Sequence, residues 1–168
     1  MRIFILTLFL LCSLQVFGKD CGTYDNLSPL QKGRLLFSYH QGQSTNLGYT
    51  LAAIALIESS AGLYRLNIYS RDLGLYQVNI KTASKVLGVT NYYKKLELAE
   101  KLIYRDILNA YVAIDVLRYF IDSHNQDWRK TIQSYNEGFN INTEKSLLYL
   151  DKVSGGVRLL QQCMNTTT

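Results

Sequence analysis

The chain has 168 residues, 48% of them hydrophobic, and its 18 Lys and Arg against 13 Asp and Glu give a formal net charge of +5. Its length suits one domain with a hydrophobic core of its own. The positive charges are scattered, with no basic run longer than Lys94-Lys95, so the composition gives little support to a nucleic-acid-binding protein. Pro29 is the single proline, and no linker, repeat or low-complexity segment divides the chain.

Residues 1–18 have the layout of a secretory signal peptide: a positive start, an apolar run over 3–11 and small residues before a cleavage point after Gly18. The run is shorter than the about 20 residues of a permanent membrane span. We therefore expect a mature domain over 19–168 that is periplasmic or secreted and has no permanent membrane span. The alternatives are an N-terminal membrane-anchoring or buried helix, and a lipoprotein lipidated on Cys12, which the bulky residue before Cys12 disfavours.

Removal of the signal peptide leaves two cysteines, Cys21 and Cys163, near the two ends of the mature chain. An oxidising compartment would allow a disulfide between them, which would stabilise the fold by roughly 4–5 kcal/mol through loop-closure entropy. Two free thiols are the alternative. His40 and His124 are isolated and no Cys/His cluster occurs, so we expect no metal site.

The remaining sequence predicts a mainly α domain. Start and stop signals and apolar spacing indicate helices over residues 29–39, 49–60, 80–87, 96–121, 128–135 and 144–160. The 49–60 helix is apolar nearly all round and is expected in the core. We expect a break near Arg105 and an interruption at Gly155-Gly156. Residues 63–78 are irregular and predict a small β-hairpin or an extended loop inserted among the helices.

Glu58 is the first candidate catalytic residue, because it is a carboxylate at the end of an apolar helix. Burial disfavours the ionised form and raises the pKa of a carboxyl group. A raised pKa is what a general acid needs at neutral pH. Alone the signal is weak, since a single Glu at a helix end is more often solvated.

A second group of candidates follows in the segment 70–79. Gly74 allows the backbone to approach a ligand closely, or to adopt a conformation that other residues resist. Gln77 and Asn79 offer amide donors and acceptors suited to sugar hydroxyl and N-acetyl groups. Asp72 offers a second carboxylate. Far downstream, Tyr135 combines a phenol with a flat apolar face, a pairing suited to sugar binding.

In chain order, Glu58-Ser59, the segment 74–79 and the segment 135–138 resemble motifs of the lytic transglycosylases of the lysozyme-like superfamily, roughly E-S, G-L-M-Q-I-N and A-Y-N-x-G. The resemblance covers about 47–153. The segment 70–79 is also similar to the S-x-D-x-G-x-x-Q-I-N segment of animal-type lysozymes. The small specialised transglycosylases that accompany secretion systems and pili share it and are the closest subgroup.

The chain departs from the family pattern at three places. Tyr76 stands where Met is usual, Ser134 replaces the usual Ala, and Leu63-Tyr64 follows the first motif in place of the commoner Phe. The Glu and Gln positions of the motifs are intact. The departures therefore concern the fit of the substrate more than the chemistry.

The resemblance implies a goose-type, lysozyme-like helical fold and cleavage of the β-1,4 bond between N-acetylmuramic acid and N-acetylglucosamine in peptidoglycan. Glu58 would first donate a proton to the glycosidic oxygen, then act as a base toward the C6 hydroxyl and give a 1,6-anhydro product. No cofactor is implied. Peptidoglycan is the expected partner, together with components of a secretion system or pilus. The residues expected to bind or position substrate are Ser59, Gly74, Tyr76, Gln77, Asn79, Tyr135 and Asn136.

Asp72 keeps a second chemistry open. In a lysozyme-like hydrolase it would be the second carboxylate, which stabilises or traps the sugar cation before water attacks. Its other interpretation is a capping or turn residue before Gly74. Two readings without catalysis also remain: a peptidoglycan-binding assembly protein on the same fold, and an inhibitor or toxin-like helical domain that uses none of these motifs.

Overall fold

The computed structural model describes residues 21–164, which form eight helices and a small three-stranded sheet. The predicted signal peptide, with Cys12, lies outside the described residues. The helices are α1 (Gly22–Asp25), α2 (Pro29–Gln43), α3 (Gly48–Ser59), α4 (Ile80–Val86), α5 (Tyr92–Tyr104), α6 (Asp106–Ser123), α7 (Trp128–Glu137) and α8 (Glu144–Cys163). The strands are β1 (Leu66–Asn67), β2 (Asp72–Leu73) and β3 (Val78–Asn79), paired antiparallel in that order.

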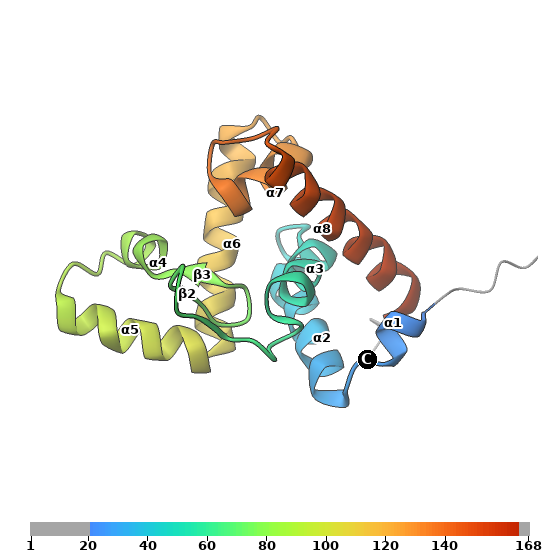
Figure 1. Ribbon diagram of the computed structural model, residues 1–168, viewed down its shortest axis with the longest axis horizontal. Coiled ribbons are helices and arrows are strands. Elements are labelled where there is room, and N and C mark those ends of the chain that lie inside the picture. Colours follow the sequence, from blue (N-terminus) through green and yellow to red (C-terminus); the bar gives the residue numbers. More distant parts are fainter. Residues whose placement is uncertain (1–20, 165–168) are drawn as a thin grey trace, which may run out of the picture.

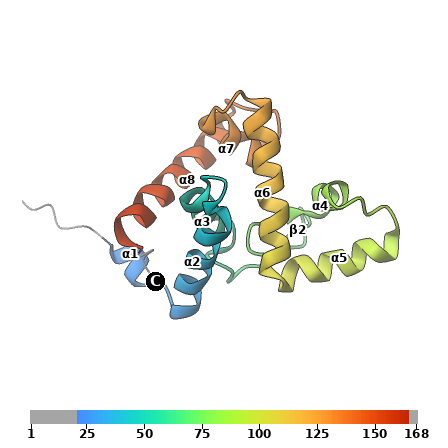
Figure 2. The same ribbon diagram turned by 180° about the vertical axis from the view of Figure 1, so that it is seen from behind.

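Helix α3 forms the centre of the core. It packs against α2 and α8, while α6 separates this group from a lobe made of α4, α5 and the sheet (Figure 1). The same division is visible from behind (Figure 2). The five residues from Leu51 to Ala55 have no exposed surface, which confirms the predicted core helix. The mainly α fold with a small β insertion is also as predicted.

Side-chain caps determine where most of the helices begin. Ser28 starts α2 with a capping box, in which its hydroxyl accepts from the Gln31 backbone and the Gln31 side chain accepts in return. At each of four further helices, the side chain of one polar residue accepts a hydrogen bond from a backbone N–H of the first turn. Such a cap stabilises a helix by about 1 kcal/mol. The four capping residues are Asn79, Asn91, Asp127 and Thr143.

Two predicted interruptions have different outcomes. The break near Arg105 is confirmed, because this residue has extended backbone angles between α5 and α6. The interruption predicted at Gly155-Gly156 is wrong, since α8 runs through both glycines. A Cβ atom at Gly156 would lie 3.2 Å from the Cβ of Ala53, so the glycine lets α8 approach α3 closely. The packing energy of this contact outweighs the low helix propensity of glycine.

A disulfide joins Cys21 to Cys163, with the two Cα atoms 5.6 Å apart. It connects the start of α1 to the end of α8, which lie together in Figure 1. The bond thus closes almost the whole described chain into one covalent loop. None of the helices between residues 21 and 164 combines the length and apolarity needed to cross a membrane.

Candidate active site

A cleft of about 650 Å³ opens between the end of α3, the sheet, α4, α6 and α7. Most of the candidate site residues line it, although they are distributed over 79 positions of sequence from Glu58 to Asn136. Three candidates lie elsewhere and are described below. The candidates that line the cleft are Glu58, Asp72, Gln77, Asn79, Tyr135 and Asn136.

Glu58 lies in the last turn of α3 and is partly buried at the wall of the cleft. Its pKa is raised to about 7, mainly by burial and to a smaller extent by the nearby negative charge of Asp72. A hydrogen bond from Tyr149 and the positive charge of Lys145 act in the opposite direction. The carboxyl group can therefore both donate and accept a proton near neutral pH, as the sequence led us to expect.

Tyr149 is a residue of the site that the sequence did not reveal. It lies on α8, and its hydroxyl donates a 2.6 Å hydrogen bond to Oε1 of Glu58. Burial and the charge of Glu58 raise the pKa of Tyr149 well above its ordinary value, so the phenol remains a donor. Its place among the buried positions of α8, with Leu150 and Val153, predicts burial. Nothing in this spacing points to Glu58 as its partner.

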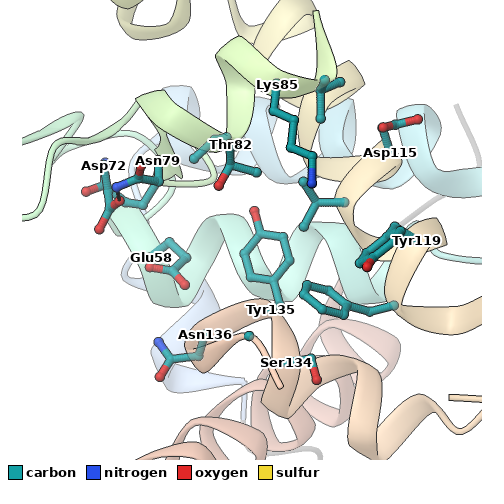
Figure 3. Close-up of a pocket in the computed structure, with 16 residues that line it drawn as sticks. Glu58, Asp72, Asn79, Thr82, Lys85, Asp115, Tyr119, Ser134, Tyr135 and Asn136 are labelled. Carbon is teal, nitrogen blue, oxygen red and sulfur yellow. Dashed lines mark hydrogen bonds between the residues drawn. The ribbon is translucent and has the colours of Figure 1, made fainter. Parts of the chain in front are cut away.

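Asp72 and Asn79 lie opposite each other on the adjacent strands β2 and β3. The register of β2 and β3 makes them partners, and Nδ2 of Asn79 donates to Oδ1 of Asp72 at 2.8 Å. The same amide nitrogen donates to the Ser70 carbonyl, and its oxygen accepts from the Lys81 backbone as the cap of α4. Asn79 therefore positions Asp72 and starts α4, which leaves little of its amide for a sugar. Figure 3 shows the pair beside Glu58 at one side of the cleft.

Tyr135 and Asn136 reach the cleft from α7. The Tyr135 hydroxyl donates to the Tyr76 carbonyl at 3.0 Å, which holds the ring upright in the cleft (Figure 3). Burial and the charge of Glu58 raise the pKa of Tyr135 well above its ordinary value. Oδ1 of Asn136 is buried without a hydrogen-bond partner within the described part of the chain. A buried acceptor of this kind is costly unless a ligand satisfies it.

Ser59 does not line the cleft, contrary to the expectation that it would orient Glu58 or a sugar. The residue is fully buried. Its hydroxyl donates to the carbonyls of Leu75 and Ala55, at 2.6 and 3.1 Å, and accepts from the Gly62 backbone at 2.9 Å. Ser59 thus binds the loop of the insertion to the end of α3 and acts on the site only through the backbone.

Gly74 is needed for contact with the protein and not with a ligand. Its φ of +81° belongs to the left-handed region. A Cβ atom here would lie 2.2 Å from the Leu102 carbonyl oxygen and 2.5 Å from Nδ2 of Asn109. Gly74 therefore provides a backbone conformation that other residues resist. It does not bring the backbone close to a ligand.

Tyr76 is also a core residue. Its side chain has no exposed surface, and its hydroxyl donates to the Ser38 hydroxyl at 2.8 Å. Burial raises the pKa of the phenol, which stays protonated. The exchange of Met for Tyr at this position therefore changes the packing under the cleft. Because it is buried, the Tyr76 side chain does not contact a sugar in the cleft, contrary to the expectation that it binds substrate.

Asn109, on α6, holds the loop between β2 and β3 in place. Its side chain is fully buried, donates to the Leu73 carbonyl at 2.9 Å and accepts from the Tyr76 backbone at 2.8 Å. The loop carries Gln77 into the cleft with a left-handed φ of 47°. An isolated Asn within an amphipathic helix has no sequence signal that distinguishes this role from solvent exposure.

The amino-acid sequence matches one known family of protein domains. Residues 35–149, more than half of the chain, match the family model of the transglycosylase SLT domain. The chain belongs to this family. SLT domains are domains of lytic transglycosylases, which act on peptidoglycan, and the helical fold with its small sheet is the lysozyme-like fold of the SLT domain.

The SLT match begins within α2 and ends at Tyr149, the donor to Glu58. It therefore spans every candidate residue of the cleft.

No curated protein and no solved structure gives a significant match. Among residues 21–164, no three His, Cys, Asp or Glu side chains come together as a metal site would require.

Proposed function

We propose that this SLT domain cleaves the β-1,4 bond between N-acetylmuramic acid and N-acetylglucosamine and releases a 1,6-anhydro product. The observation that carries the proposal is the partly buried Glu58, whose pKa is raised to about 7 at the wall of the cleft. A carboxyl group in this state is protonated often enough to act as an acid and ionised readily enough to act as a base.

The reaction uses Glu58 twice. The protonated carboxyl donates its proton to the glycosidic oxygen, and the bond from C1 to this oxygen breaks as positive charge develops at C1. The N-acetyl oxygen of the same sugar stabilises this charge. The Glu58 carboxylate then takes the proton of the C6 hydroxyl, and O6 bonds to C1. No water is consumed, so the products together weigh as much as the substrate.

Polar groups near Glu58 are available to hold the muramyl sugar. The Gln77 amide nitrogen donates to the Gly74 carbonyl at 2.9 Å, which fixes the amide at the cleft wall. Asn136 also lines the cleft, and its side-chain amide is suited to a sugar hydroxyl or N-acetyl group. The Tyr135 ring offers a flat apolar face for the sugar ring. In this role the hydroxyl of Tyr135 stays bound to the protein.

Asp72 supports a second candidate, the hydrolase. It lines the same cleft and is near enough for its charge to raise the pKa of Glu58. In that reaction Asp72 would stabilise the sugar cation while Glu58 activates water. Its hydrogen bond from Asn79 fits both the hydrolase and a structural role.

The test is a digestion of purified peptidoglycan by the wild-type protein and by Glu58→Gln, with mass analysis of the soluble muropeptides. We expect 1,6-anhydro products from the wild type and none from the variant. Products heavier by one water would establish the hydrolase instead. A wild-type protein that binds peptidoglycan without releasing products, and a Glu58→Gln variant that complements as well as it does, would support the non-catalytic assembly protein.

We further propose that the protein is exported and opens the cell wall locally for a secretion system or pilus. The signal-like segment 1–18 and the Cys21–Cys163 disulfide, which suits an oxidising compartment, support export. The similarity of the segment 70–79 to the specialised transglycosylases supports the assembly role. Fractionation of producing cells, with the intact mass of the protein, tests export and cleavage after Gly18. Co-purification with envelope assemblies tests the partner.

A further inference from the structure

One side of the cleft, formed by α4 and α6, carries two charges of opposite sign that the glycan reaction does not use. Lys85 lies in the last turn of α4 and Asp115 in the middle of α6, and both line the cleft and are exposed. The two helices pack against each other. None of the ion pairs formed among residues 21–164 includes either side chain. In Figure 3 the amino end of Lys85 extends into the cleft above Tyr135.

An exposed aromatic ring lies beside these charges. Tyr119 follows Asp115 by one helical turn on α6, so both side chains are on the same face. The Tyr119 side chain lines the cleft and is 56% exposed. This side of the cleft thus offers a cation, an anion and an apolar ring, whereas Gln77 and Asn136 offer amide groups elsewhere in its lining.

The chemistry of the two sides suits different parts of peptidoglycan. Glycan strands present hydroxyl and N-acetyl groups, which amides bind well. The peptide stem attached to each muramic acid has free carboxylates, and its diamino acid has an ammonium group on an aliphatic chain. A stem is therefore a ligand with both signs of charge and an apolar segment between them.

We propose that Lys85 and Asp115 form a binding site for the peptide stem, which makes the protein selective for stem-bearing strands. Lys85 binds a stem carboxylate, Asp115 binds the ammonium group of the diamino acid, and the aliphatic chain lies on the Tyr119 ring. The inference rests on the proposed function, because it assumes that a glycan strand occupies the cleft beside Glu58. Beyond that function, it states which form of peptidoglycan the protein prefers and which residues recognise the stem.

The test measures binding in the Glu58→Gln background, in which substrate is not consumed. The probes are soluble peptidoglycan strands with intact stems, and the same strands after an amidase has removed the stems. Because a solvent-exposed ion pair changes affinity by about fivefold at most, we expect Lys85→Met and Asp115→Asn each to reduce the preference for stem-bearing strands by up to about fivefold. The preference should also weaken as salt rises.

Two matched variants serve as controls. Lys81→Met removes the same charge from α4, and Asp122→Asn removes the same charge from α6, and neither residue lines the cleft. Both controls should keep the full preference for stem-bearing strands. A loss of preference equal to that of the cleft variants would show a general effect of net charge and would overturn the stem site.

The outcomes separate this inference from the proposed function. Equal affinity for both kinds of strand, or a preference that survives Lys85→Met and Asp115→Asn, overturns the stem site even if the wild type releases anhydro products. Stem-dependent binding that both cleft variants weaken supports the stem site. If that binding occurs while the wild-type protein releases no products, the proposed reaction fails and the stem site stands.

Discussion

The hydroxyl of Tyr149 donates a 2.6 Å hydrogen bond to Oε1 of Glu58, across 91 positions of sequence. The bond links the last helix to the end of the core helix α3. A hydrogen bond from a phenol to a charged carboxylate is stronger than one to a neutral carboxyl group. The bond therefore stabilises the ionised form of Glu58. In the proposed reaction Tyr149 is thus a positioning residue for Glu58, since it would act through that side chain.

Replacement of Tyr149 by Phe should therefore shift the pH profile. Glu58 must be protonated to act as an acid, so activity falls as pH rises through its pKa of about 7. Loss of the hydrogen bond favours the protonated form, and the falling limb should move to higher pH. Because a hydrogen bond to a charged group is lost, we expect activity to fall by about tenfold or more. The measurement is kcat/KM against pH, with Tyr111→Phe on the exposed face of α6 as control. An unshifted limb would contradict the role.

Asp72→Asn distinguishes the two chemistries. The Asp72 charge raises the pKa of Glu58, so its removal should move the falling limb to lower pH. In the anhydro-forming reaction we expect kcat/KM to fall less than about tenfold, because the effect passes through the Glu58 pKa alone. The products should remain 1,6-anhydro. Near-complete loss of turnover, with water-containing products from the wild type, would instead assign Asp72 to the reaction.

Glu58→Gln should stabilise the fold at neutral and alkaline pH. Below about pH 4.5 the carboxyl is protonated in both the folded and unfolded states; as pH rises to about 7 the unfolded chain ionises first, so the wild type loses stability. The full loss is about 3 kcal/mol above that range. The amide keeps an acceptor for Tyr149. Urea unfolding at pH 4 and pH 8 should show a gain for the variant only at pH 8, and a gain of equal size at both values would refute the linkage.

Much of the fold could be predicted because its elements are locally encoded. Ser28 and Pro29 mark the start of α2, and the unbroken apolar run over 49–60 identifies the core helix. The effect of the glycines of α8 could not be predicted from the local sequence, because the role of Gly156 depends on its contact with Ala53 on another helix. Propensity describes a residue alone, whereas packing depends on its partner.

The candidate site was predictable in part for the same reason. Glu58 stands out locally because a carboxylate interrupts apolar sequence, and motif order identified Gln77 and Tyr135. Ser59 and Tyr76 lie in the same motifs yet are buried, since neighbours in sequence point to different sides of a chain segment. Tyr149 and Asn109 act through contacts 91 and 33 positions away, respectively, which no local pattern encodes.

Asn109→Leu should destabilise the protein strongly despite the similar size of the two side chains. The Leu73 carbonyl and the Tyr76 N–H would both lose a buried partner, at a cost of about 2–4 kcal/mol together. Because the loop carries Gln77, activity at low temperature should fall as well. Thermal unfolding of the variant is compared with Asn140→Leu, an exposed loop position. A melting temperature equal to that of the control would show that the loop is held in another way.

Loss of the Cys21–Cys163 disulfide should lower stability without altering chemistry. The bond closes a loop with a sequence separation of 142, for which chain entropy predicts about 5 kcal/mol. The double variant Cys21→Ser/Cys163→Ser should unfold at lower urea concentration, and reduction of the wild type should have the same effect. Neither cysteine lines the cleft, so the folded variant should retain its turnover rate. A loss of turnover in a variant whose stability is unchanged would contradict this prediction.

The position of Tyr149 on the final helix has a consequence for the order in which this protein gains activity. Glu58 belongs to the first half of the chain, yet its donor is supplied only when α8 has been synthesised and docked. A nascent or truncated chain contains the reactive carboxyl without the group that orients it. If Glu58 acts as proposed, the chain therefore reaches full activity only after its last helix has docked against α3.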